Sequence, residues 1–272
     1  MRTIKSVLIR GVAAAGLIGT GLAGAAGTGS AAGDDFGKPL VPGTTITEQR
    51  DVSAERTNGH SFLEINGAGQ LVYWTRAGAS FVPQVRGTDW ANTRAITSLD
   101  ETHFIEIKGD FRLSLWTWNG SFYTEKNVGQ GWEPARLVSG VAPNAFLEIN
   151  NLGDLRVWYF DGNYSITGYD PIGTQWDNTR AIAGKDFVDF IEIEGAGAVS
   201  EWYDFESAGH ALRETRFDVA DFTAVRLIVG TDFQHFLVIL TNGDLYEFTL
   251  QDNGEYTPVR VGQDWGGTRL IG

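Results

Sequence analysis

The chain has 272 residues with a formal net charge of −13, and it contains 35 glycines, nine tryptophans and no cysteine. The lack of cysteine excludes disulfides and thiolate metal sites, and the acidic balance argues against nucleic acid and anionic membranes as partners. The length allows one large domain or two small ones.

Residues 1–32 have the pattern of a secretion signal peptide. Arg2, Lys5 and Arg10 precede an apolar stretch rich in alanine and glycine, and small residues that suit a signal peptidase follow it. The stretch is too short and too rich in glycine for a membrane span. We therefore expect a secreted, extracellular protein, with a flexible lead-in at residues 33–45.

Residues 46–272 contain an internal repeat. An aromatic residue followed four positions later by arginine occurs five times, at intervals of about 42 to 46 residues, as Trp90/Arg94, Trp132/Arg136, Trp176/Arg180, Phe222/Arg226 and Trp265/Arg269. Strand-like runs with the pattern Phe-x-(Glu/Val)-Ile share this period. A period in the low forties with several short alternating strands is typical of propeller blades. We expect an all-β protein, a five-bladed β-propeller of four-stranded antiparallel blades.

The third repeat shows how one unit is expected to fold. Strands are predicted at 146–149, 155–160, 164–169 and 179–182, separated by turns rich in Asn, Gly and Asp, and the four together form the predicted blade. The segment Asp51–Arg56 is the candidate for closing the ring beside the last unit. The second strand of each repeat carries one large aromatic residue, which we expect in the core: Trp74, Trp116, Trp158, Trp202 and Phe248.

The repeated tryptophan loops are the candidate ligand-binding sites. An indole face can stack on the apolar face of a sugar ring, while neighbouring Asp and Asn side chains bind hydroxyl groups. A second interpretation stays open, in which each loop indole is a wedge that packs neighbouring blades together. The candidate residues are Asp89, Trp90, Asn92, Trp132, Trp176, Asp177, Asn178, Asp264 and Trp265.

The repeated charged residues also allow two interpretations. The arginines could contact a ligand, but each lies one strand away from a repeated glutamate, so we expect internal pairs of Arg94 with Glu106, Arg136 with Glu148 and Arg180 with Glu192. The glutamates would suit a glycoside hydrolase only if their environments differed. Because they repeat with the symmetry of the fold, we expect structural roles for them and no enzymatic activity. No cofactor is implied, and the histidine spacing does not resemble a metal site.

The loops carry a Gly-x-x-Trp motif at Gly87–Trp90, Gly129–Trp132, Gly173–Trp176 and Gly262–Trp265. Five repeats of this length, four of them closing with such a loop, resemble the tachylectin-2-like lectins. The resemblance implies a five-bladed propeller that binds N-acetylated amino sugars through one pocket per repeat, between adjacent blades. The repeat that ends in Phe222 has lost both the glycine and the indole, so we expect its site to be weak.

Together these observations predict a secreted, multivalent, non-catalytic carbohydrate-binding protein with one shallow site per blade and with glycans as partners. The main alternative belongs to another class. A propeller rim is also a platform for protein docking, so the chain could bind an extracellular protein and modulate an enzyme such as a protease. Glycoside hydrolysis is the second alternative.

Overall fold

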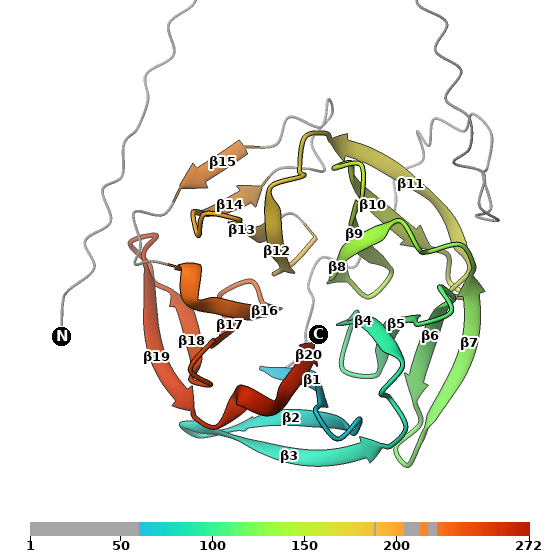
Figure 1. The fold of residues 1–272 in the computed structure, drawn as a ribbon, viewed down its shortest axis with the longest axis horizontal. Helices are drawn as coiled ribbons and strands as arrows, with labels where there is room; N and C mark the ends of the chain where they lie inside the picture. The colour runs from blue at the N-terminus through green and yellow to red at the C-terminus, as the bar shows by residue number, and fades with distance from the viewer. Residues whose placement is uncertain (1–59, 188, 204–212, 217–221) are drawn as a thin grey trace, which may run out of the picture.

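The computed structural model describes residues 60–187, 189–203, 213–216 and 222–272. Within them the chain is a five-bladed β-propeller, as predicted: five four-stranded antiparallel sheets surround a central axis (Figure 1). The expected signal peptide, the lead-in and the segment Asp51–Arg56 lie outside the described residues. Among the described residues, no helix has the length and apolar character needed to cross a membrane.

The blades are numbered I to V, each given from its inner to its outer strand. Blade I contains β20 (Thr268–Ile271), β1 (Ser61–Asn66), β2 (Leu71–Ala77) and β3 (Ser80–Gly87). Blade II contains β4 (Thr93–Ser98), β5 (His103–Lys108), β6 (Leu113–Trp118) and β7 (Tyr123–Gly129). Blade III contains β8 (Ala135–Ala142), β9 (Ala145–Asn150), β10 (Leu155–Phe160) and β11 (Ile166–Gly173). Blade IV contains β12 (Thr179–Gly184), β13 (Asp189–Glu194), β14 (Val199–Tyr203) and β15 (Arg213–Arg216). Blade V contains β16 (Val225–Asp232), β17 (His235–Leu240), β18 (Leu245–Leu250) and β19 (Tyr256–Gly262), and short 3₁₀ turns η1 (Phe222–Ala224) and η2 (Trp265–Gly267) precede β16 and β20.

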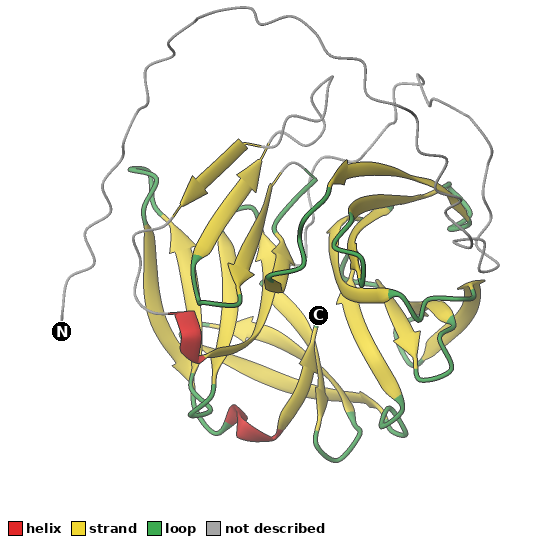
Figure 2. Ribbon diagram, turned by 45° about the horizontal axis from the view of Figure 1, so that its top comes forward, coloured by secondary structure: helices red, strands yellow, loops and turns green. Residues whose placement is uncertain are grey.

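The burial of the strands follows from the packing of blades face to face (Figure 2). The two middle strands of blade III, β9 and β10, are buried at every position, because both faces of the sheet are covered by neighbouring blades. The outer strand β7 is largely exposed. The first turn of a blade needs a left-handed residue, which is Gly69 in blade I (φ 72°) and Phe111 in blade II (φ 65°).

The predicted assignment of strands to blades was wrong by one strand. The strand predicted at 179–182 is part of β12, which is the inner strand of blade IV and pairs with β13, not with any strand of blade III. The inner strand of blade III is instead β8, which precedes the Phe146 run. Each tryptophan loop therefore leads from the outer strand of one blade into the inner strand of the next.

The ring is closed by the C-terminal strand. β20 pairs antiparallel with β1, with Glu64 opposite Ile271, and the amide of Leu63 donates to the carbonyl of Gly272 at 2.8 Å. Blade I thus combines one strand from the end of the chain with three from the beginning of the described region (Figure 1). The strand paired with β1 on its inner side is thus β20, the inner strand of blade I; the segment Asp51–Arg56 that the sequence suggested for closure lies outside the described residues.

The five repeated arginines link each inner strand to the next blade. Within the described residues they form no ion pair with the repeated glutamates, so the predicted Arg–Glu pairs were wrong. Each guanidinium donates instead to main-chain carbonyls in the preceding loop and at the start of the neighbouring inner strand, a geometry that a planar fork of N–H groups fits well. The acceptors are Trp132 and Ala135 for Arg94, Trp176 and Thr179 for Arg136, Phe222, Thr223 and Val225 for Arg180, Trp265 and Thr268 for Arg226, and Trp90 and Thr93 for Arg269.

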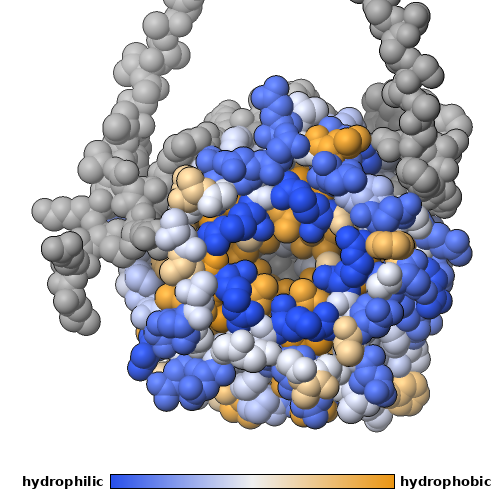
Figure 3. Space-filling model, viewed as in Figure 1, coloured by the Kyte–Doolittle hydropathy of each residue, from blue (hydrophilic) through white to orange (hydrophobic). Residues whose placement is uncertain are grey.

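The inner strands approach most closely at their far ends. A Cβ atom on Gly184 would lie 2.1 Å from the carbonyl oxygen of Gly140, and one on Gly230 would lie 1.9 Å from that of Gly184, so only glycine fits at these positions. Hydrophilic residues surround the central hollow on the face shown in Figure 3, with hydrophobic residues deeper inside.

Candidate functional site: pockets between the blades

The four Gly-x-x-Trp loops share one backbone conformation. The residue before each tryptophan is left-handed: Asp89 (φ 68°), Gly131 (φ 72°), Gln175 (φ 71°) and Asp264 (φ 69°). The tryptophan amide then donates to a carbonyl in the first turn of the preceding blade, for example from Trp90 to Gly69 at 2.9 Å and from Trp176 to Gly153 at 2.9 Å. The repeated sequence motif is therefore a repeated loop geometry that spans two blades.

The loop tryptophans are wedges between blades. Their exposed fractions are 8% for Trp90, 0% for Trp132, 7% for Trp176 and 8% for Trp265. The glycine of the motif lies under the indole: a Cβ on Gly87 would sit 2.6 Å from Nε1 of Trp90, and the other three loops give nearly the same distance. The motif therefore needs its glycine because the Nε1 edge of the indole packs against the backbone of the previous blade's outer strand. Of the two interpretations left open by the sequence, the wedge describes these side chains.

The second-strand tryptophans are more accessible than the loop tryptophans in three blades. Trp74, Trp116 and Trp202 are half-buried, whereas the sequence placed them in the core. Each contacts the loop indole of its blade, with ring centroids 4.5 Å apart for Trp74 and Trp265 and 4.7 Å for Trp116 and Trp90. These indoles line the boundary between neighbouring blades.

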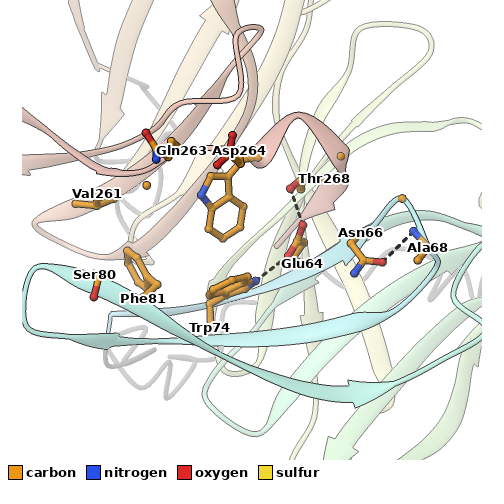
Figure 4. A pocket seen from close by; sticks show the side chains of 14 residues that line it. Glu64, Asn66, Ala68, Trp74, Ser80, Phe81, Val261, Gln263, Asp264 and Thr268 are labelled. Carbon is orange, nitrogen blue, oxygen red and sulfur yellow. Dashed lines mark hydrogen bonds between the residues drawn. The ribbon is translucent and has the colours of Figure 1, made fainter.

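A buried glutamate orients each of these indoles. In blade I, Nε1 of Trp74 donates to Glu64 at 2.8 Å, and the hydroxyl of Thr268 donates to the other carboxylate oxygen at 2.5 Å (Figure 4). Blade II repeats the arrangement with Trp116, Glu106 and Thr93, and blade IV with Trp202, Glu192 and Thr179. This Thr–Glu–Trp triad satisfies two buried donors, and its three members come from three neighbouring strands of one sheet.

Three equivalent pockets open beside the triads. We name them by the blades they separate: the V/I pocket has a volume of about 530 Å³, the I/II pocket about 540 Å³ and the III/IV pocket about 410 Å³. Each is lined by a loop tryptophan, a second-strand tryptophan, the triad glutamate and threonine, and polar residues of the Gly-x-x-Trp loop. Figure 4 shows the V/I pocket, with Gln263 and Asp264 on one side and Trp74 and Phe81 on the other.

The I/II pocket carries the most charge. Lys108 donates to Glu125 at 2.5 Å and lies 5.1 Å from the centroid of the Trp116 ring. Burial raises the pKa of Glu106 despite its hydrogen bonds from Thr93 and Trp116. Burial alone would raise the pKa of Glu125. The hydrogen bond from Lys108 and further interactions outweigh burial, so the pKa of Glu125 lies below its ordinary value. The pocket thus presents ionised and hydrogen-bonding groups around one half-buried indole.

We call the two remaining blade boundaries filled, because the described residues at their triad positions are all buried. At the II/III boundary Trp158 is 1% exposed, Ala135 takes the place of the triad threonine, and the Tyr169 ring covers the indole at a centroid distance of 4.7 Å. At the IV/V boundary the triad positions hold Val225, Val238 and Phe248, and the loop residue is Phe222, all of them buried. At the IV/V boundary, apolar residues thus occupy all four of the positions that hold a threonine, a glutamate and two tryptophans at the open boundaries.

The candidate site residues separate into two groups. Seven of them line the three pockets: Asp89, Trp90, Asn92, Trp176, Asn178, Asp264 and Trp265. Trp132 is fully buried at the filled II/III boundary. Asp177 lies over the first turn of blade III, where its carboxylate would be 2.7 Å from a Cβ on Gly153. A ligand-binding role for any of them stays a prediction.

Sequence reasoning missed the triads and the accessible indoles. Their signal was present, because the repeat with Val238 in place of glutamate also has Phe248 in place of the second-strand tryptophan and Val225 in place of threonine. Residues that change together across repeats are expected to contact one another.

Comparisons with known proteins give likeness of fold alone. No family model matches the chain, and no curated protein matches it in sequence. Among solved structures, the SapL1 lectin in complex with α-methyl fucoside is 11% identical over 78% of this chain and 84% of its own, with a TM-score of 0.46. A functionally unknown protein from Desulfotomaculum acetoxidans is 13% identical over 79% of this chain and 70% of its own, with a TM-score of 0.43. Yeast RCC1 (Prp20), bound to Kap60, is 11% identical with a TM-score of 0.41; the match covers 72% of this chain, which spans 57% of the yeast protein's length.

Proposed function

We propose that this chain is an exported, non-catalytic carbohydrate-binding protein whose sites are the V/I, I/II and III/IV pockets. The observation that carries the proposal is the recurrence, at three blade boundaries, of a half-buried indole beside hydroxyl, amide and carboxylate groups. Sugars offer an apolar C–H face and a rim of hydroxyl groups, which this combination suits. Volumes of 410 to 540 Å³ fall within the range of roughly 300–1,000 Å³ typical of small-molecule sites.

The stacking surface in this proposal is the second-strand indole. Trp74, Trp116 and Trp202 are half-buried and line the pockets, whereas the loop indoles are almost entirely covered. The loop contributes its polar side chains instead. In the I/II pocket these are Asp89 and Asn92.

The triad geometry supports binding over hydrolysis. Both carboxylate oxygens of Glu64 already accept hydrogen bonds, from Thr268 and Trp74, and Glu106 has the equivalent partners. A glycosidase needs two carboxylates in different environments, one as acid and one as base or nucleophile. These glutamates share the same hydrogen-bond partners, a threonine and an indole, which is what an orienting residue requires.

Three pockets on one rigid ring would make binding multivalent. A single shallow site is expected to be weak, but a repeating glycan that reaches two pockets would gain avidity of about 10²–10⁴-fold without any new contact. We therefore expect polymeric glycans to bind much more tightly than monosaccharides.

The test is a glycan array, followed by titration with N-acetylglucosamine, its oligomers and methyl α-fucoside. The informative variant is Asp89→Gly/Gln175→Gly/Asp264→Gly, which removes one polar side chain from each pocket. Glycine tolerates the left-handed backbone at these positions, and Gly131 is the natural example. The matched control is Glu101→Gln/Asp252→Asn, which removes the same number of carboxylates from exposed positions outside the pockets.

We expect the natural protein and the control to bind at least one glycan, and the pocket variant to lose that binding while keeping its fold. Loss in the control as well, or unchanged binding in the pocket variant, would contradict the assignment of the site. Absence of binding to every glycan, together with recovery of one stoichiometric protein from culture medium, would replace the proposal with the protein-docking alternative.

A further inference from the structure

A cluster of metal-ligating side chains lies at the boundary between blades V and I. His60 immediately precedes β1, while Asp232 and His235 flank the turn between β16 and β17. One potential ligand atom from each of the three residues lies within 4.8 Å of the others. Because β1 and β16 both place these ends away from the Gly-x-x-Trp loops, the cluster is on the opposite face from the pockets, and its role is independent of the proposed function.

The geometry of the cluster fits a divalent transition metal. Nε2 of His60 lies 3.3 Å from Oδ2 of Asp232, and Nδ1 of His235 lies 2.7 Å from Oδ1 of the same carboxylate. Zinc bonds of 2.0–2.1 Å in a tetrahedron place ligand atoms about 3.4 Å apart, so small side-chain rotations suffice to form the site. Two imidazoles and one carboxylate leave a further position for water.

The surroundings hold the ligands in the required orientation. Nδ1 of His60 faces Glu247 at 4.0 Å, which leaves Nε2 directed towards Asp232. Glu247 is held in turn by Arg76 at 2.7 Å. A carboxylate behind a ligating histidine is a usual arrangement in zinc proteins; at 4.0 Å Glu247 lies beyond hydrogen-bond distance and acts on the His60 ring through its charge.

Two further features of the cluster support a ligand. His60 is a non-glycine residue with a left-handed backbone (φ 56°), and its ring centroid lies 4.2 Å from that of His235. Such a backbone is strained and persists where the surroundings over-determine it.

We propose that His60, Asp232 and His235 bind one zinc-class divalent cation, which joins the beginning of β1 to blade V. The ion would add a second link at the boundary that the C-terminal strand already closes. Spacing along the sequence could not show this set, because its first histidine lies in a different blade from the other two residues.

Blade II provides a natural control. Asp100 and His103 form the same Asp-x-x-His turn, with Nδ1 of His103 3.0 Å from the carboxylate. The neighbouring ring there is Tyr164, stacked at 4.4 Å, in place of a second imidazole. Burial and the nearby Asp100 raise the pKa of Tyr164, so this phenol stays protonated at neutral pH and is a poor metal ligand.

The test uses the purified protein without a histidine tag. Isothermal titration with ZnCl₂ should give one site per chain, and Co²⁺ should produce the visible absorption of a low-symmetry site with nitrogen and oxygen ligands. His60→Ala and His235→Ala should each weaken binding by more than about tenfold and abolish the rise in Tm on adding zinc, whereas His103→Ala should change neither. Because His60 is partly exposed, its variant is expected to fold even if the His235 variant does not.

Zinc binding that survives His60→Ala, or that His103→Ala removes, would overturn the proposal. So would the absence of any saturable zinc or cobalt binding by the natural protein. Glu247→Gln supplies a graded check, since loss of the carboxylate behind a ligand should weaken binding by about 10–100-fold.

Discussion

The open boundaries of this propeller differ from the filled IV/V boundary in four equivalent positions, but from the filled II/III boundary in only one of the four, where Ala135 stands in place of the triad threonine. At the V/I, I/II and III/IV boundaries a glutamate holds a threonine and a half-buried indole beside a pocket. At the IV/V boundary the four positions are valine, valine and two phenylalanines, and at the II/III boundary Tyr169 covers the indole. One scaffold therefore accommodates boundaries with and without a pocket. The glutamate accompanies the second-strand indole: Glu148 accepts from Nε1 of Trp158 at 2.5 Å even at the filled II/III boundary, whereas Val238 replaces it beside Phe248.

Replacing an indole at a filled boundary should have the largest effect. Trp132→Ala removes a fully buried side chain and should lower the free energy of unfolding by about 3–5 kcal/mol. Trp116→Ala at the open I/II boundary should cost clearly less, because that ring is half-buried and water can enter the space it leaves. Urea denaturation of both variants measures the difference. Equal losses would show that the two boundaries are packed alike.

Replacing one member of a triad should lower the free energy of unfolding more than replacing all three members with the apolar residues of the IV/V boundary. Glu64→Val leaves the N–H of Trp74 and the hydroxyl of Thr268 without their acceptor and should lower the free energy of unfolding by about 2–4 kcal/mol. The triple variant Glu64→Val/Thr268→Val/Trp74→Phe copies the IV/V boundary and should recover at least half of that loss. A triple variant as unstable as the sum of its single variants would contradict the account of the triad.

The buried triad glutamate Glu106 should make the thermal stability of the protein depend on pH. Burial raises the pKa of Glu106 in the folded protein, so the folded state favours the protonated form. Stability from this group is present below the unfolded pKa and is lost as the pH rises through the folded pKa. Glu106→Gln does not titrate, so its Tm relative to the natural protein should increase from pH 4 to pH 7. A Tm difference that falls or stays constant over this interval would contradict the assignment.

The smallest effect is expected from the pocket loops. Asp89→Gly keeps the left-handed backbone and removes an exposed side chain, so the free energy of unfolding should change by less than about 0.5 kcal/mol. Thermal unfolding checks this directly. A large loss would mean that the Asp89 side chain supports the loop, and the variant could not then be used to test binding.

The repeat pattern predicted the architecture because each repeat is one supersecondary unit that buries its faces only against its neighbours. The period alone does not show which strand begins a blade, because the repeat has the same length whichever strand it is counted from. The sequence therefore assigned the strand 179–182 to the wrong blade, and the pairing of β20 with β1 had to come from the structure.

The roles of the two tryptophan sets could not be predicted for a similar reason. Strand alternation shows that an indole points out of a sheet, but it does not show whether the neighbouring blade covers it. Gly87 and the other motif glycines marked the place where an indole packs on backbone, which is a wedge and not a platform. The contacts of His60 with blade V depend on closure of the ring, so no local pattern indicates them.

The most direct test of the account is a titration of the indole N–H signals by NMR, with ¹⁵N-tryptophan protein and oligomers of N-acetylglucosamine or the best glycan from the array. The account predicts that the signals of Trp74, Trp116 and Trp202 shift with saturation, while those of Trp132 and Trp158 at the filled boundary do not move. Saturable glycan binding that leaves the first three signals in place would contradict it.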